Sequence, residues 1–156
     1  MPLVPSVATF GLHRPRTVYA TTGATVHPDH MAASENVKAA VFLARLDKWE
    51  EVSGGAALAE TAAWAVDRLF FPHCKMEPPW AEFAFAVDVS AVYDRKRAAL
   101  REYRSIFAPE DRLLALYEAE DQYIGRLLGV AYAEPFRSHS PLLVHDPGIF
   151  LPGSHG

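Results

Sequence analysis

Residues 16–46, RTVYATTGATVHPDHMAASENVKAAVFLARL, decide the fold because they join a short strand to a long helix. The segment 16–21 is rich in β-branched and aromatic residues, which is typical of a strand. Over residues 28–46, apolar residues recur at helical spacing and predict a helix with one buried stripe. That stripe consists of Ala33, Val37, Ala40, Val41 and Ala44. A strand that leads directly into a helix is the building unit of α/β folds.

The rest of the chain continues this alternation, which predicts an α/β fold. The further strands that the composition predicts are 68–71, 82–89 and 130–133. Ser90 is a favourable N-cap for a helix that runs to about residue 104. Pro109 suits the first turn of another helix, which Gly129 ends. Residues 53–65 are compatible with either a loop or a short helix.

The chain divides into three segments. Residues 1–12 hold two prolines and show no periodicity, so we expect an irregular lead-in. Residues 13–137 form the predicted α/β domain. Residues 138–156 contain proline, glycine and scattered apolar residues, which indicate an extended C-terminal tail. Because the apolar residues of the tail have no periodic place in the chain, we expect them to pack on a neighbouring subunit of a homo-oligomer.

Composition excludes several classes of protein. The 156 residues are 50% hydrophobic and 22% charged, as in a globular domain. The net charge of −4 argues against a nucleic-acid coat and against a polybasic membrane anchor. A single cysteine, Cys74, excludes an internal disulfide framework. No apolar run approaches the ~20 residues of a membrane-spanning helix, and the N-terminus does not resemble a signal peptide. We therefore expect a cytoplasmic protein.

The tetrapeptide His27-Pro28-Asp29-His30 is the clearest chemical signal. Pro28 suits the first helical position, which places His27 at the N-cap and His30 in the first turn. The positive end of the helix dipole disfavours protonated imidazole and so favours the neutral, metal-ligating form. A catalytic zinc takes three protein ligands, more than this turn can supply in good geometry. The alternative interpretation is that these residues merely cap a helix.

Four blocks of sequence carry a family resemblance. They are 26–34 together with 40–46, then 85–90, 96–105 and 125–136. In this order and spacing the blocks resemble the LmbE/PIG-L-like deacetylases, which are zinc-dependent enzymes that remove acetyl groups from N-acetylglucosaminyl compounds. The resemblance covers roughly residues 13–140. It implies a Rossmann-like partial sheet flanked by helices, without the family's N-terminal strands and first metal motif.

The resemblance also implies roles for three residues. His30 would be a ligand of Zn²⁺, and His27 would stabilise the tetrahedral intermediate. Asp29 would orient one of the two rings. The implied reaction is attack of a zinc-activated water on the acetamide carbonyl of an N-acetylated amino sugar.

The family's first motif, His-Pro-Asp-Asp, would contribute the other two zinc ligands and the general base, and it is absent from these residues. We therefore expect the chain to supply only part of the site, with a companion chain as one way to complete it. The alternative is a non-catalytic α/β binding or oligomerisation module that has lost its metal site. A third hypothesis is an anion-binding module that uses Arg97 and Arg101.

A few other polar residues are open to a structural interpretation. Asp88 and Ser90 are expected to end a strand and cap a helix. The pattern alone gives Glu134 a structural role at a strand end. His73 has no partner at metal spacing, so its position beside Cys74 is interpreted as incidental.

Overall fold

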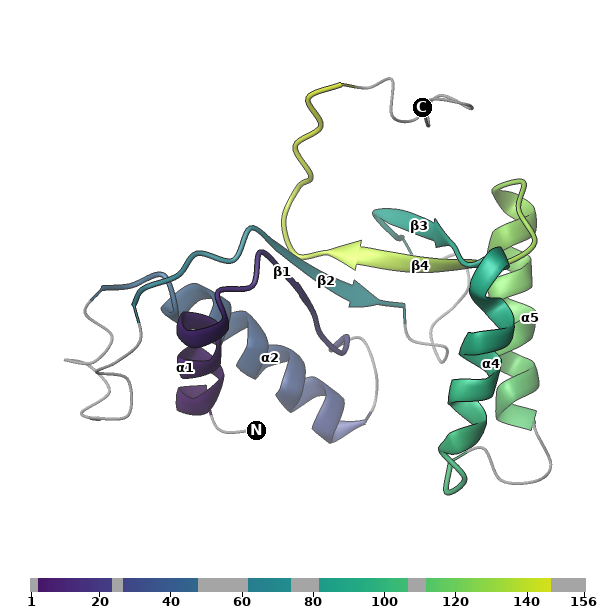
Figure 1. The fold of residues 1–156 in the computed structure, drawn as a ribbon, viewed down its shortest axis with the longest axis horizontal. Coiled ribbons are helices and arrows are strands. Elements are labelled where there is room, and N and C mark those ends of the chain that lie inside the picture. Colours follow the sequence, from purple (N-terminus) through teal and green to yellow (C-terminus); the bar gives the residue numbers. More distant parts are fainter. Residues whose placement is uncertain (1–2, 24–26, 48–61, 74–81, 107–111, 147–156) are drawn as a thin grey trace.

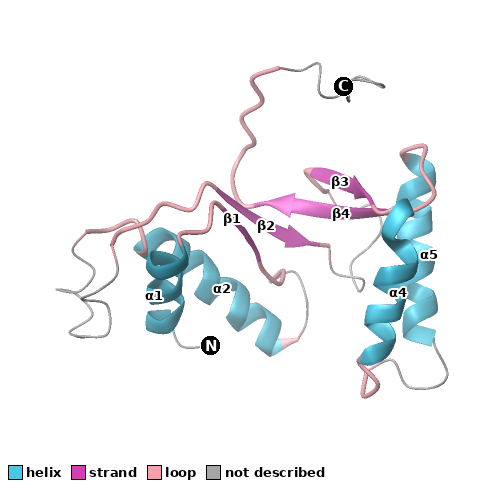
Figure 2. Cartoon of the chain, viewed as in Figure 1, coloured by secondary structure: helices cyan, strands magenta, loops and turns pink. Residues whose placement is uncertain are grey.

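The computed structural model describes residues 3–23, 27–47, 62–73, 82–106 and 112–146 (Figure 1). It confirms the α/β class: a four-stranded open sheet is flanked by helices (Figure 2). The helices are α1 (Leu3–His13), α2 (Pro28–Leu43), α4 (Tyr93–Glu102) and α5 (Arg112–Leu127). The strands are β1 (Thr17–Tyr19), β2 (Arg68–Pro72), β3 (Phe85–Asp88) and β4 (Ala133–Ser138).

The sheet is mixed, with the strand order β1-β2-β4-β3. Strands β1 and β2 are parallel and pair Val18 with Leu69. Strand β4 is antiparallel to both of its neighbours, so β1, β2 and β3 all run in one direction. Their carboxyl ends therefore lie at one edge of the sheet, where α/β folds collect ligands.

Helices α1 and α2 pack together against one face of the sheet near β1 (Figure 1). Their shared core consists of Val7, Phe10, Ala40 and Ala44. The expectation of an irregular lead-in over residues 1–12 is therefore wrong, because Leu3–His13 forms α1. Val7 and Phe10 of this helix are buried against α2, and Pro5 is tolerated because it lies in the first turn.

Helices α4 and α5 stand side by side at the other end of the molecule (Figure 1). Gly129, with φ +81°, lies just beyond α5 and confirms the predicted end of that helix. The strand predicted at 130–133 instead spans Ala133–Ser138. Residues 130–132 form the turn out of α5, in which the Val130 N–H donates to the Gly125 carbonyl at 2.9 Å. This turn back onto α5 delays the strand.

The capping of α4 also differs from the prediction. A 3-10 turn, Ser90–Val92, precedes α4, and its side-chain acceptor is Asp88. The Asp88 Oδ1 accepts from the Ser90 N–H at 2.9 Å and from the Ser90 Oγ–H at 2.6 Å. Ser90 is thus the residue being capped, and Asp88 supplies the acceptor.

Some expectations fall on parts of the chain that are not described. Residues 53–61 and 147–156, which include most of the ambiguous segment and the end of the predicted tail, lie outside the described residues. From 139 to 146 the tail forms neither helix nor strand. No helix among the described residues is long and apolar enough to cross a membrane.

Candidate functional site

The His27–His30 turn lies at the N-terminus of α2, after β1, on the sheet edge where the parallel strands end. His27 is the N-cap, with extended backbone angles (φ −81°, ψ 119°), and Pro28 opens the helix as predicted. The His27 Nδ1 accepts a hydrogen bond from the Asp29 N–H at 3.3 Å. An imidazole therefore does here what a serine or aspartate does at an ordinary N-cap.

The two imidazole rings of the turn lie together. Their centroids are 4.9 Å apart and the rings are tilted by 35°. Both side chains are exposed to solvent. Because the His27 Nδ1 accepts an N–H, the proton of the neutral His27 ring belongs on Nε2. His27 is therefore suited to donate a hydrogen bond through Nε2.

Asp29 lies between the two histidines. It contacts His27 through its backbone N–H, and its carboxylate lies in the first turn of α2, where negative charge is favourable. The role that the resemblance gives to this carboxylate, orienting a ring, stays a prediction.

The turn by itself does not provide a complete zinc site. Within the described ranges, no group of three or more His, Cys, Asp or Glu side chains is placed to hold a metal ion. A catalytic zinc normally takes three protein ligands. The imidazole of His30 fits the donor chemistry of zinc, so the described residues suit a part of a site.

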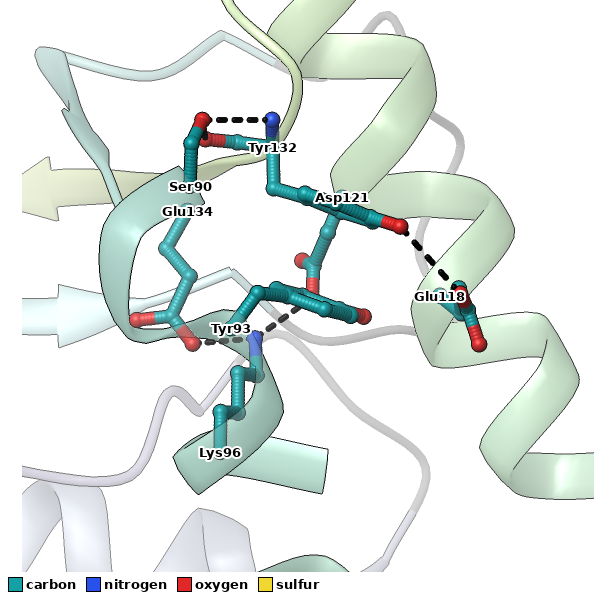
Figure 3. Close-up of polar contacts among 7 residues, drawn as sticks. All are labelled: Ser90, Tyr93, Lys96, Glu118, Asp121, Tyr132 and Glu134. Carbon is teal, nitrogen blue, oxygen red and sulfur yellow. Dashed lines mark hydrogen bonds and ion pairs between the residues drawn. The ribbon is translucent and has the colours of Figure 1, made fainter. Parts of the chain in front are cut away.

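A second polar cluster lies at the same edge of the sheet, between α4, α5 and β4 (Figure 3). We call Tyr93, Lys96, Asp121 and Glu134 the lysine cluster. The Lys96 ammonium lies between two carboxylates: its Nζ is 2.5 Å from Asp121 Oδ2, and it also pairs with Glu134. Asp121 is fully buried, and the Tyr93 hydroxyl donates to it at 3.2 Å. The cluster joins three segments that are distant in sequence.

Stacking and hydrogen bonds hold Tyr93 in place. Its ring stacks on Tyr132 with centroids 3.6 Å apart and an angle of 9° (Figure 3). Burial, together with the negative charge of Asp121, raises the pKa of the Tyr93 hydroxyl. Tyr93 therefore remains a phenol and a hydrogen-bond donor at neutral pH.

A buried histidine contacts the residue of α5 that precedes Asp121 in sequence. His73 follows β2, and its Nε2 is 3.2 Å from Oε1 of Glu120, the neighbour of Asp121 in α5. Both side chains are buried. The interpretation of His73 considered only partners at metal spacing, and the structure adds a partner of another kind, because α5 brings Glu120 to it from far along the chain.

The partners of His73 and Lys96 are distant in sequence, although one feature of α5 indicates that such partners exist. Asp121 lies three residues before Ile124, and Glu120 lies four residues before it, so both share the buried side of α5. Carboxylates on an apolar helical stripe are rarely buried unless they are paired. Two acidic residues at these positions indicate that their hydrogen-bonding or cationic partners lie on other elements, without saying which ones.

Several solved structures share the fold of this chain. The chain matches the conserved protein TT1542 from Thermus thermophilus with 38% identity and a TM-score of 0.74. It also matches N,N'-diacetylchitobiose deacetylase from Pyrococcus horikoshii (18% identity, TM-score 0.73) and 4-carboxy-2-hydroxymuconate hydratase from Pseudomonas putida KT2440 (15%, 0.71). No protein-family profile matches the sequence.

The matches cover nearly all of this chain but only part of each matched chain. They cover 91%, 95% and 92% of this chain but 59%, 52% and 60% of the Thermus, Pyrococcus and Pseudomonas chains, respectively. The chain therefore spans a little more than half the length of the proteins it resembles. The fold is shared with a deacetylase and with a hydratase, so the fold alone does not choose between their reactions.

Proposed function

We propose that this chain is part of a zinc-dependent hydrolase of the LmbE/PIG-L type. Its reaction would remove the acetyl group from a small molecule that contains N-acetylglucosamine. The observation that carries the proposal is the pair of imidazoles 4.9 Å apart at the N-terminus of α2, at the ligand-collecting edge of a fold shared with a deacetylase. A hydratase shares the fold as well, so the choice of hydrolysis rests on the resemblance of the four sequence blocks to the LmbE/PIG-L-like deacetylases.

The two histidines would have different roles. His30 would bind zinc, because its exposed imidazole is a common zinc ligand and lies beside the ring of His27. His27, whose Nδ1 is already an acceptor, would donate from Nε2 to the oxygen on which negative charge develops. Zinc, when bound, supplies polarisation of the acetamide carbonyl. The remaining ligands would come from a polypeptide segment outside these 156 residues.

Zinc binding tests the proposal directly. We expect the purified chain to bind zinc only weakly at neutral pH in isothermal titration calorimetry at high zinc concentration, because it supplies only part of the ligand set. His30→Ala should weaken the affinity by at least about tenfold, because it removes the only ligand that we assign here. His145→Ala, which removes an exposed histidine of the tail, is the matched control and should leave zinc binding unchanged.

Two results would count against a zinc enzyme. One is equal affinity for zinc in His30→Ala and in the control. The other is no zinc binding at neutral pH by a chain whose circular dichroism shows it to be folded. Either result would favour the alternative function, a non-catalytic α/β binding or oligomerisation module.

A further inference from the structure

Four aromatic side chains cross the sheet on one face. Tyr19 comes from β1, Phe70 from β2, Phe136 from β4 and Phe85 from β3, and we call this set the aromatic face. Residues that pair directly across neighbouring strands lie on the same face, and the pairs Tyr19–Phe70 and Phe85–Phe136 are in register. The sheet therefore presents one aromatic ring from each of its strands.

These rings contact one another in a closed circuit. The centroid distances are 5.7 Å for Tyr19–Phe70, 4.8 Å for Phe70–Phe85, 5.3 Å for Phe85–Phe136 and 5.8 Å for Phe136–Tyr19. Even so, Tyr19 is 63% exposed and the three phenylalanines are only half-buried. Among the described residues, these rings are therefore shielded chiefly by one another.

The opposite face of the sheet is covered differently. Val18 packs against the core of α1 and α2, and Leu69 and Phe71 are buried. The Lys38 ammonium of α2 lies over the ring of Phe71. The solvated face of a sheet normally carries polar side chains, so a face made of four aromatic rings resembles half of an unfinished core.

The outer edge of β1 lies beside the aromatic face. Within the described part of the chain, β1 pairs only with β2 and forms one border of the sheet. A border strand presents unpaired N–H and C=O groups that can pair with a further strand. An apolar face and an open strand next to it together suit an α/β segment that adds a strand to β1 and lays a helix on the rings.

The Thermus match supplies a candidate for such a segment. It aligns 91% of this chain with 59% of the TT1542 chain at 38% identity, so about two-fifths of TT1542 has no counterpart in these residues. We propose that the aromatic face and the β1 edge form the docking surface for a companion polypeptide equivalent to that remaining part of TT1542. The inference concerns packing and does not depend on whether the chain binds zinc.

A complex formed without metal tests this interface. The probe is the part of TT1542 that lies outside the matched region, produced as a separate polypeptide and mixed with this chain. We expect a 1:1 complex in sedimentation velocity and slower hydrogen exchange at the β1 amides. Tyr19→Lys, at a well-exposed position, should weaken the complex by at least about tenfold, because an aromatic anchor becomes a charge.

Leu12→Lys is the matched control, because Leu12 is 69% exposed but lies on α1. It should leave the complex intact. A second form, with the probe tethered to this chain by a flexible linker, raises the effective concentration to about the millimolar range. Tethering keeps the test decisive even where the probe does not fold alone.

Two outcomes would overturn the proposal. One is a tethered form whose β1 amides exchange as fast as those of the chain alone. The other is self-association of the chain that Tyr19→Lys abolishes while the probe gives no protection, which would assign the aromatic face to a second copy. Neither outcome bears on zinc binding, so this proposal and the proposed function can fail independently.

Discussion

The His27–His30 turn and the lysine cluster lie at the same sheet edge but are built in opposite ways. The turn is local: its residues are adjacent in sequence, exposed and linked by a backbone-to-imidazole hydrogen bond. The lysine cluster joins α4, α5 and β4, and its central carboxylate, Asp121, is fully buried.

This difference shows what each region contributes. Exposed, lightly held imidazoles add little to the free energy of unfolding and remain accessible to a ligand. The partly buried Lys96 ammonium, which lies between two carboxylates, contributes mainly by fixing how α4, α5 and β4 meet. Under the proposed function, the turn would contact the ligand and the lysine cluster would support this edge of the sheet.

The largest expected effect is at Asp121. Asp121→Ala takes one of its two carboxylate partners from the partly buried Lys96 and removes the acceptor of the Tyr93 hydroxyl. We expect the free energy of unfolding to fall by about 3 kcal/mol, because one partner of a buried ion pair is lost. Urea denaturation followed by circular dichroism measures the change.

His30→Ala is the reference for this measurement. Its side chain is exposed, so the free energy of unfolding should change by no more than about 0.5 kcal/mol. If Asp121→Ala lowered the free energy of unfolding as little as His30→Ala does, the lysine cluster would not be a structural support of this edge.

The next largest expected change in the free energy of unfolding is at Gly125, on the side of α5 that faces the turn into β4. A Cβ at this position would lie 2.8 Å from the backbone of Ala131 and of Tyr132. Backbone atoms cannot move aside as a flexible side chain does, so we expect Gly125→Ala to cost about 2 kcal/mol despite the better helix propensity of alanine.

Gly129→Ala separates this steric effect from backbone strain. Gly129 has φ +81°, and a methyl group at this position would have nothing within 4 Å, so only the left-handed conformation opposes the substitution. That cost is about 1 kcal/mol. If Gly125→Ala were the milder of the two substitutions, the proposed close packing of α5 on β4 would be wrong.

The smallest expected effect is a pH dependence of stability that arises from the Asp88 carboxyl. The hydrogen bonds from the Ser90 hydroxyl and from the Ser90 N–H lower the pKa of the Asp88 carboxyl below 3.8. A carboxyl whose pKa is lowered by folding stabilises the protein above its unfolded pKa. This contribution is lost as the pH falls from about 4 through the lowered pKa.

Carboxyl-carbon NMR titration checks this prediction at a single residue. Removing the hydroxyl in Ser90→Ala should move the pKa of Asp88 upward, since that hydrogen bond is the largest cause of the shift. An unchanged pKa of Asp88 in this variant would show that the backbone N–H alone is responsible.

Sequence patterns predicted the helix ends correctly where those ends depend on residues close together in the chain. Helix α2 begins at Pro28 as predicted, and α5 ends at Leu127, just before Gly129, because capping and left-handed conformations are local. The errors arose where long-range packing decides. Helix α1 has no clear periodicity of its own and is stabilised by Ala40 and Ala44 of α2. The start of β4 depends on the approach of the chain to Gly125.

The sequence by itself determined the α/β class, the start of α2 and the pair of histidines in its first turn, because these depend on residues within a few positions of one another. The tertiary structure alone decided that Lys96 meets Asp121 and Glu134, that His73 meets Glu120, and that four rings from four strands share one face. Such contacts depend on strand order and helix packing, which no local spacing encodes. The residues of a strand-to-helix turn determine its conformation locally, whereas a buried carboxylate depends on partners that are distant in sequence.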